Sequence, residues 1–259
     1  MSGAYIAGAV TGLGTVLGTV TVGRSLRRVK TENAGRPRMS WKRSLAAWFP
    51  FPEFLHRLYW TIEWMRAVHC VQCPIFDHPT KLYAFLHDQI LRGGAFDYLE
   101  FGVASGTTMR VWCGLNQDTR SRFFGFDSFL GLPEDWNHLP KGTFSQQGIP
   151  PEIQDPRVQF EVGWFQDTLP GFLSGYHQQR PLIIHNDSDV YSSTLYLLSM
   201  LDRLIDSEVI VIFDEFYDVL HEFRAIVDYC NAYRKRFRII AATSRFIQAA
   251  IHFSPNPPE

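Results

Sequence analysis

DYLEFGVASG, residues 97–106, is the stretch that decides the fold of this chain. Its first half is a short run of aromatic and aliphatic residues, which is typical of a β-strand. The run ends in a turn that contains Gly102 and Gly106, and residues 107–112 continue with a helical pattern. Gly102 can take backbone conformations that are closed to other residues and lets a ligand approach the main chain. The order of strand, glycine turn and helix predicts an α/β unit whose helix N-terminus attracts an anionic group.

The spacing of the glycines argues against a dinucleotide site and a nicotinamide-dependent oxidoreductase. Such a site uses G-x-G-x-x-G with an acidic residue about 20 residues later, whereas this chain has E-x-G-x-x-x-G. That pattern resembles the first motif of class I S-adenosylmethionine-dependent methyltransferases, in which the glycine turn holds the methionine end of the cofactor. The resemblance implies cofactor contacts from Glu100, Gly102, Ser105, Gly106 and Thr107.

Strand and helix patterns alternate along the rest of the chain. Further strand patterns lie at 122–127, 158–162, 182–187, 209–213, 238–242 and 246–253. Alternating units predict a mostly parallel sheet with helices on both faces, and the last two strands read as an antiparallel hairpin. We therefore expect an α/β fold with a Rossmann-like, seven-stranded sheet, which is the arrangement of class I methyltransferases.

Two further positions are candidates for cofactor binding. The strand at 122–127 ends in Asp127, followed by Ser128, 21 residues after Gly106. In a nucleotide-binding sheet, a carboxylate at this position accepts hydrogen bonds from ribose hydroxyls. Trp164 follows the strand at 158–162, and it belongs either beside the adenine or in the core.

Acidic residues also follow two later strands. Asp187 and Asp189 come after the strand at 182–187, and Asp214 and Glu215 follow 209–213. Ligands bind beyond the carboxyl ends of such strands, so we expect these four side chains to converge beside the cofactor. Clustered carboxylates repel and need a cation or protons, and oxygen ligands alone suit Mg²⁺ or another hard divalent ion. The alternative is a set of independent helix caps, with Asp189 as one of them.

The segment DSDVYSST, residues 187–194, resembles the D-x-D-x-Y-x-S-T segment of macrocin-type O-methyltransferases. Residues 126–133, 163–170 and 211–215 also resemble that family, and the similarity covers roughly 81–253. Members of the family methylate sugar hydroxyls in antibiotic biosynthesis.

The resemblance implies Mg²⁺-assisted O-methylation of a hydroxyl on a sugar-like or diol small molecule, with S-adenosylmethionine as the methyl donor. By matching position, Asp187, Asp214 and Glu215 are the metal ligands, Asp187 also borders the cofactor, and Asp189 is the catalytic base. The chain departs from the family at Glu215, where the family usually has Asp.

Two other functions stay open at this point. One is a methyltransferase directed at nitrogen, a peptide or a lipid-linked acceptor. The other is a catalytically silent module that binds the cofactor or a partner, which the intact acids argue against. The net charge of −1 argues against a protein that binds nucleic acid through its overall charge. The sequence does not decide whether the chain forms a homo-oligomer.

Charge and hydropathy divide the chain into three regions. Residues 1–52 form a Gly/Thr-rich leader with eight Lys or Arg and one acid, Glu32, which leaves −8 for the remainder. This leader is either a disordered or processed segment or a membrane contact through residues 4–30. The four cysteines show no disulfide framework, which suits a cytoplasmic protein, with membrane association as the alternative.

The other two regions are expected to form the enzyme itself. Residues 53–92 predict an N-terminal helical cap, and 93–259 predict the methyltransferase domain with a lid-like loop at 128–156. Apolar residues recur at three- and four-residue steps in 53–69, which indicates an amphipathic helix. We expect its apolar face, which includes Phe54, Leu58 and Ile62, to pack on the main domain; an exposed partner-binding face is the alternative.

Overall fold

The computed structural model describes residues 51–206 and 208–256. The expectations for the leader therefore lie almost entirely outside the described residues. In chain order the elements are α2 (Phe51–His69), β1 (Ile75–Phe76), α3 (Pro79–Phe85), the π-helical turn η1 (Leu86–Ile90), β2 (Asp97–Phe101), α4 (Thr107–Leu115), β3 (Arg122–Asp127), β4 (Val158–Val162), α5 (Phe165–Gly175), β5 (Leu182–Asn186), α6 (Tyr191–Met200), β6 (Ile210–Phe213), α7 (Glu222–Ala232), β7 (Lys235–Thr243), the 3₁₀ turn η2 (Ser244–Phe246) and β8 (Ala249–Pro255).

One mixed sheet contains all the strands, in the order β1-β7-β8-β6-β5-β2-β3-β4. Strand β8 is antiparallel to both of its neighbours, and every other pairing is parallel. The predicted fold class and the C-terminal hairpin are confirmed. The sheet has eight strands where seven were expected, because β1 pairs with β7 at one edge. The two residues of β1 are too few to show a strand pattern in the sequence. Through β1, the segment 53–92 contributes one edge strand to the sheet.

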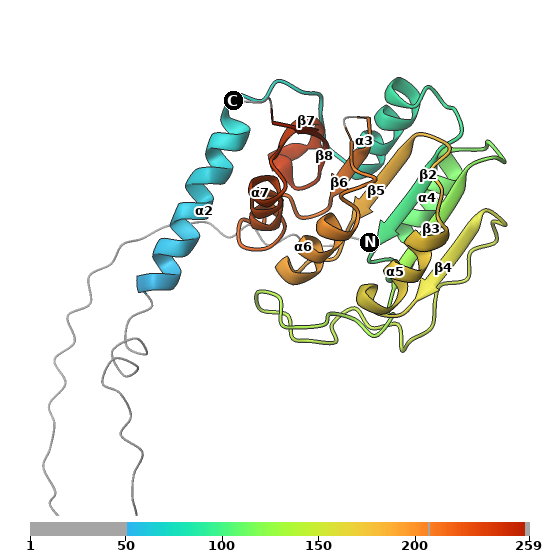
Figure 1. Ribbon diagram of the computed structural model, residues 1–259, viewed down its shortest axis with the longest axis horizontal. Coiled ribbons are helices and arrows are strands. Elements are labelled where there is room, and N and C mark those ends of the chain that lie inside the picture. The colour runs from blue at the N-terminus through green and yellow to red at the C-terminus, as the bar shows by residue number, and fades with distance from the viewer. Residues whose placement is uncertain (1–50, 207, 257–259) are drawn as a thin grey trace, which may run out of the picture. The chain divides into compact units, whose positions relative to one another are not determined.

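Helices cover both faces of the sheet (Figure 1). On one face, α5, α6 and α7 pack on strand residues such as Leu99, Phe126 and Val211. On the other face, α3 and α4 pack on alternate strand residues such as Tyr98, Phe123 and Ile212. Central strands buried on both sides explain the continuous apolar runs in the sequence, and they leave the strand ends as the place for polar chemistry.

The glycine turn after β2 lies against the end of β5. Gly102 has a φ of 88°, and a Cβ there would come within 1.8 Å of the carbonyl oxygen of Asp187. The carboxylate of Asp127 holds the turn, because its Oδ2 accepts the backbone N–H groups of Val103 and Ala104 at 2.9 and 2.8 Å. The ends of β2, β3 and β5 are thereby fixed to one another.

The long loop between β3 and β4 is tied down by its own hydrogen bonds and by contacts across the sheet edge. Within the loop, the N–H of Leu132 donates to the carbonyl of Thr143 at 3.0 Å. Farther along, Trp136 Nε1 and Asn137 Nδ2 both donate to Oδ2 of Asp218, at 3.1 and 2.9 Å. Because Asp218 follows β6, the loop reaches from the β3 side of the sheet edge to the β6 side.

Helix α2 contacts the domain through a different face from the one expected. Trp60 packs edge-on against Phe223, and Trp64 Nε1 donates to the carbonyl of Phe216 at 3.1 Å. The side chains of Phe54 and Leu58, predicted to pack on the domain, are exposed. That expectation was wrong because α2 is apolar on both sides, so hydrophobic periodicity alone did not show which side the domain covers. Among residues 51–206 and 208–256, no helix combines the length and apolar character needed to cross a membrane.

Two glycines provide a direct test of the close contact at the turn. We predict that Gly102→Ala lowers the free energy of unfolding by about 2 kcal/mol or more, for two reasons. The residue has a positive φ, which strains alanine, and the added Cβ collides with the backbone of Asp187. Gly114→Ala, in α4 with open space around the new Cβ, should raise it by about 0.5–1 kcal/mol. Urea unfolding of both variants measures the difference; equal effects would contradict the packing described here.

Candidate active site

A cavity of about 280 Å³ opens at the carboxyl ends of β2, β3 and β5, beneath the long loop. The loop contributes apolar walls, including Leu132, Trp136 and Phe144. Seven of the residues predicted from the sequence line this space: Gly102, Asp127, Ser128, Trp164, Asp187, Asp189 and Glu215. The structure thus brings the glycine turn and the acid-bearing loops together around one volume.

The other predicted residues of the turn lie outside the cavity wall. Ser105 and Thr107 are exposed and contact each other through their hydroxyls at 3.0 Å. Gly106 is buried, and a Cβ there would come within 2.8 Å of Pro151 Cγ. The end of the long loop therefore covers the start of α4, and roles for Ser105, Gly106 and Thr107 rest on the motif alone.

Glu100 lies inside β2 and is almost fully buried. Its Oε2 has no hydrogen-bond partner among the described residues. Burial raises the pKa of this carboxyl to about 8, although the neighbouring Tyr98 hydroxyl lowers it. Glu100 is therefore a carboxyl behind the glycine turn that carries its proton near neutral pH.

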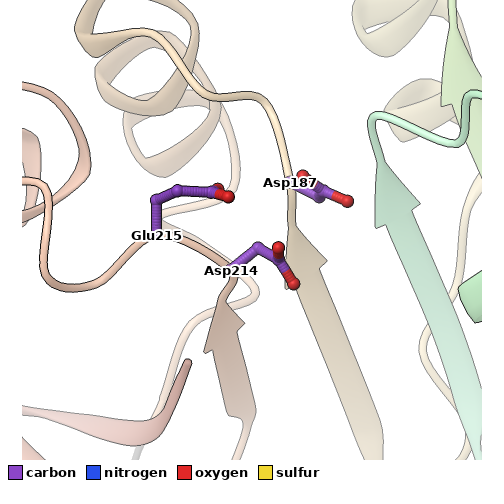
Figure 2. Close-up of side chains that lie close together, drawn as sticks. All are labelled: Asp187, Asp214 and Glu215. Carbon is purple, nitrogen blue, oxygen red and sulfur yellow. The ribbon is translucent and has the colours of Figure 1, made fainter. Parts of the chain in front are cut away.

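The acids that follow β5 and β6 form a cluster. Asp187, Asp214 and Glu215 each offer a carboxylate oxygen, and these oxygens lie within 4.8 Å of one another. Figure 2 shows the three side chains close together, beyond the ends of the two strands. Three of the four acids expected to converge are thus close together, whereas Asp189 is not part of this group.

Electrostatics make this cluster costly without a counter-charge. Burial, and then the charge of Asp214, raises the pKa of Asp187 well above its usual range and that of Glu215 to about 12. Neither residue forms a salt bridge with Lys or Arg within the described ranges. The donor set consists of hard oxygens, and Glu215 Oε2 is buried without a described hydrogen-bond partner. These features fit a divalent cation such as Mg²⁺.

Asp189 lies on the same loop as Asp187 but outside the acid cluster. It is buried at the cavity wall and has a φ of 61°, a backbone conformation that Asp tolerates better than most residues. Burial, followed by the charge of Asp214, raises the pKa of its carboxyl to about 7. A carboxyl with that pKa can exchange a proton near neutral pH.

Asp214 is oriented by buried polar groups from behind. The Nε2 atom of His185 lies 3.5 Å from Oδ1 of Asp214, and Nδ1 of the same ring lies 2.8 Å from the Tyr98 hydroxyl. Gln248 donates its side-chain N–H to the same Asp214 oxygen and accepts from the Tyr83 hydroxyl at 3.0 Å. These contacts fix the side chain from the side away from the cavity.

Glu222 is a member of the site that the sequence did not reveal. It is fully buried at the start of α7, and its Oε1 accepts the side-chain N–H of Asn186 at 2.6 Å. Its Oε2 accepts the backbone N–H of Glu215 at 3.0 Å. One carboxyl group thus joins the last residue of β5 to the loop that follows β6. Its position, seven residues after Glu215 in an amphipathic helix, matches none of the motifs, and only its place on the buried side of that helix was available as a signal.

Hydroxyl groups complete the anchorage of the loop after β5. Ser188 Oγ donates to Asn186 Oδ1 at 2.9 Å, and Asn186 Nδ2 donates to Thr194 Oγ1 at 3.2 Å. Tyr191 donates its hydroxyl to Asp228 on α7 at 2.9 Å. Ser188, Tyr191 and Thr194 therefore shape the loop that carries Asp187 and Asp189.

We predict that Glu222→Ala lowers the free energy of unfolding by about 2–4 kcal/mol, because two buried donors lose their acceptor. The measurement is urea unfolding at pH 5.5, where burial and nearby acids, which raise the pKa of Glu222 well above its usual range, keep it neutral. Asp228→Ala on the same helix is the control and should cost less than about 1 kcal/mol, because Asp228 is partly exposed. Similar losses in both variants would contradict the linking role of Glu222.

Comparison with known proteins shows that part of the chain is similar to methyltransferases. A family model described as a methyltransferase domain matches residues 99–216. The 8-demethyl-8-(2,3-dimethoxy-alpha-L-rhamnosyl)-tetracenomycin-C 4'-O-methyltransferase of Streptomyces olivaceus is 30% identical over 158 residues, which cover 49% of this chain. The aligned part spans 58% of the length of that relative.

A solved structure extends the similarity to the fold. The calicheamicin methyltransferase CalS11 superposes with a TM-score of 0.54 and 18% identity, covering 85% of this chain and 99% of CalS11. At that identity the likeness concerns the fold alone. The matched segment, 99–216, begins in β2 and ends just after the acid pair that follows β6. Residues 99–216 therefore match a methyltransferase domain, and the resemblance to the class I S-adenosylmethionine-dependent methyltransferases is confirmed.

Proposed function

We propose that the chain transfers a methyl group from S-adenosylmethionine to a hydroxyl of a small sugar-like or diol acceptor, assisted by Mg²⁺ or another hard divalent cation. The observation that carries this proposal is the single cavity that joins the glycine turn to the acid cluster. The Streptomyces olivaceus relative supports the acceptor class, because its name describes O-methylation of a rhamnosyl group.

We assign the cofactor to the part of the cavity between the glycine turn and Trp164. The backbone of Gly102 is accessible there, and Ser128 and Trp164 form the adjoining wall. Asp127 has both carboxylate oxygens engaged by backbone N–H groups, including that of Phe129 at 2.7 Å. Oδ2 accepts two of these N–H groups and Oδ1 accepts one, so Oδ1 has a further lone pair. The carboxylate can therefore still accept a ribose hydroxyl through Oδ1 while it holds the turn.

Asp187, Asp214 and Glu215 would hold the cation. When bound there, a divalent cation supplies positive charge that lowers the pKa of an acceptor hydroxyl. The side chain of Glu215 is one methylene longer than the aspartate usual in macrocin-type enzymes. A carboxylate oxygen of Glu215 still lies within 4.8 Å of those of the other two acids, which supports a direct role as a ligand.

Asp189 is the proposed base. S-adenosylmethionine supplies an electrophilic methyl group on a sulfonium, and S-adenosylhomocysteine is left after transfer. Asp189 accepts the proton that the acceptor hydroxyl loses as its oxygen bonds to the methyl carbon. The cavity walls formed by the long loop limit access of water and hold the acceptor oxygen in line with the methyl group, which is the main requirement of this reaction.

We predict that Asp189→Asn lowers methyl transfer by about 100-fold or more while S-adenosylhomocysteine binds as before, because the amide cannot accept the proton at neutral pH. Turnover is measured as transfer of labelled methyl groups to a panel of glycosides and catechols, and binding by calorimetry. Asp167→Asn, an exposed acid in the first turn of α5, is the matched control and should leave both quantities unchanged.

Two results would count against the proposal at different levels. Undiminished turnover in Asp189→Asn would remove the base assignment and leave the methyltransferase function in place. A folded full-length chain that does not bind S-adenosylhomocysteine, with or without Mg²⁺, would contradict the function itself.

A further inference from the structure

Helix α2 carries a second apolar face on the side opposite to its contact with the domain. At 100° per residue, Trp60 and Trp64 point toward one side of the helix, and both contact the domain. The side chains on the other side are 37–60% exposed. They form what we call the α2 patch: Phe54, Leu55, Leu58, Tyr59, Ile62 and Met65.

The α2 patch is not required to hold the helix in place. The opposite side already fixes α2 through the indole of Trp64, which donates to the carbonyl of Phe216, and through Trp60, which packs on Phe223 and lies under the guanidinium of Arg224. Six adjacent apolar side chains in water are unfavourable, and a contiguous patch of this kind marks an interaction surface.

The charge of the adjoining sequence indicates the kind of surface that the α2 patch meets. Residues 1–52 hold eight Lys or Arg and one acid, a net charge of +7, and the cations all lie between Arg24 and Arg43, just before the helix. The remainder of the chain carries −8. A basic stretch that continues into an exposed apolar helix face is the combination that attracts a helix to anionic lipid.

We propose that the α2 patch docks on the surface of a lipid bilayer that contains anionic lipid. The helix lies along the surface, with Phe54, Leu58 and Ile62 among the upper acyl chains. Tyr59 suits this position because it has an apolar ring and a polar tip. The basic residues 24–43 add electrostatic attraction to the headgroups, and the two contributions together give firmer binding than either alone.

A second copy of the chain is the competing occupant of the α2 patch. Pairing through α2 would also bury the apolar side chains. It would, however, join two segments of +7 charge in one assembly without neutralising either. Anionic lipid covers the apolar face and neutralises the basic stretch at the same time, and for that reason we favour it.

Vesicle sedimentation with the full chain tests this inference. The vesicles are phosphatidylcholine with one quarter phosphatidylglycerol, and phosphatidylcholine alone. The variant Phe54→Gln/Leu58→Gln/Ile62→Gln removes three patch side chains that have no part in the core. The control, Ile75→Gln/Val162→Gln/Ile247→Gln, removes three equally exposed apolar side chains elsewhere.

We expect the chain and the control to bind the anionic vesicles, and the patch variant to partition at least about tenfold more weakly, because it loses buried apolar area. Binding should be weaker without anionic lipid and at 0.5 M NaCl. Equal binding of the patch variant and the parent chain would overturn the proposal, since residues before α2 would then suffice. Absence of vesicle binding would overturn it as well. A dimer that the patch variant converts to a monomer, seen by light scattering without vesicle binding, would assign the α2 patch to a second copy.

Discussion

Repulsion among closely spaced, partly buried carboxylates is the constraint on which the candidate site depends. Asp187, Asp214 and Glu215 lie within a few ångströms of one another at the edge of the sheet, and Glu222 lies directly behind them. Acids in such surroundings must either bind protons or face a cation. These acids lie at the carboxyl ends of the strands, where the glycine turn and the long apolar loop also meet. We place the chemistry there for that reason.

The sheet makes this arrangement possible through simple geometry. Neighbouring parallel strands end at the same edge of the sheet. Residues that directly follow β5 and β6 are therefore close in space although they are far apart in the sequence. Gly102 allows the β2 turn to approach the backbone of Asp187, and Glu222 ties the end of β5 to the loop after β6. The site is thus held by backbone packing and by one buried carboxyl group, while the cavity face stays available for ligands.

Much of this could be predicted from the sequence because strand ends and glycine turns leave local patterns. The positions of Asp127, Asp187, Asp214 and Glu215 follow from that logic. Glu222 could not be found in this way, because its role arises from contacts to Asn186 and to the backbone of Glu215 that no spacing rule encodes. The same holds for α2, whose two apolar sides give the same periodicity whichever one packs, and for β1, which is too short to leave a pattern.

The most direct test of the proposed cation site is a Mg²⁺ titration of the metal-stripped full chain at pH 8. Binding is measured by calorimetry, and its effect on stability by thermal unfolding. We expect saturable binding that raises the free energy of unfolding by about 2.7 kcal/mol at a Mg²⁺ concentration of a hundred times Kd. In Asp187→Asn this gain should be lost. The metal-free variant should itself be more stable, because folding no longer requires this carboxyl either to bind a proton or to stay charged beside the other acids. No heat of binding and no change in stability on adding Mg²⁺, Mn²⁺ or Ca²⁺ to the folded parent chain would contradict the claim that the acid cluster is a cation site.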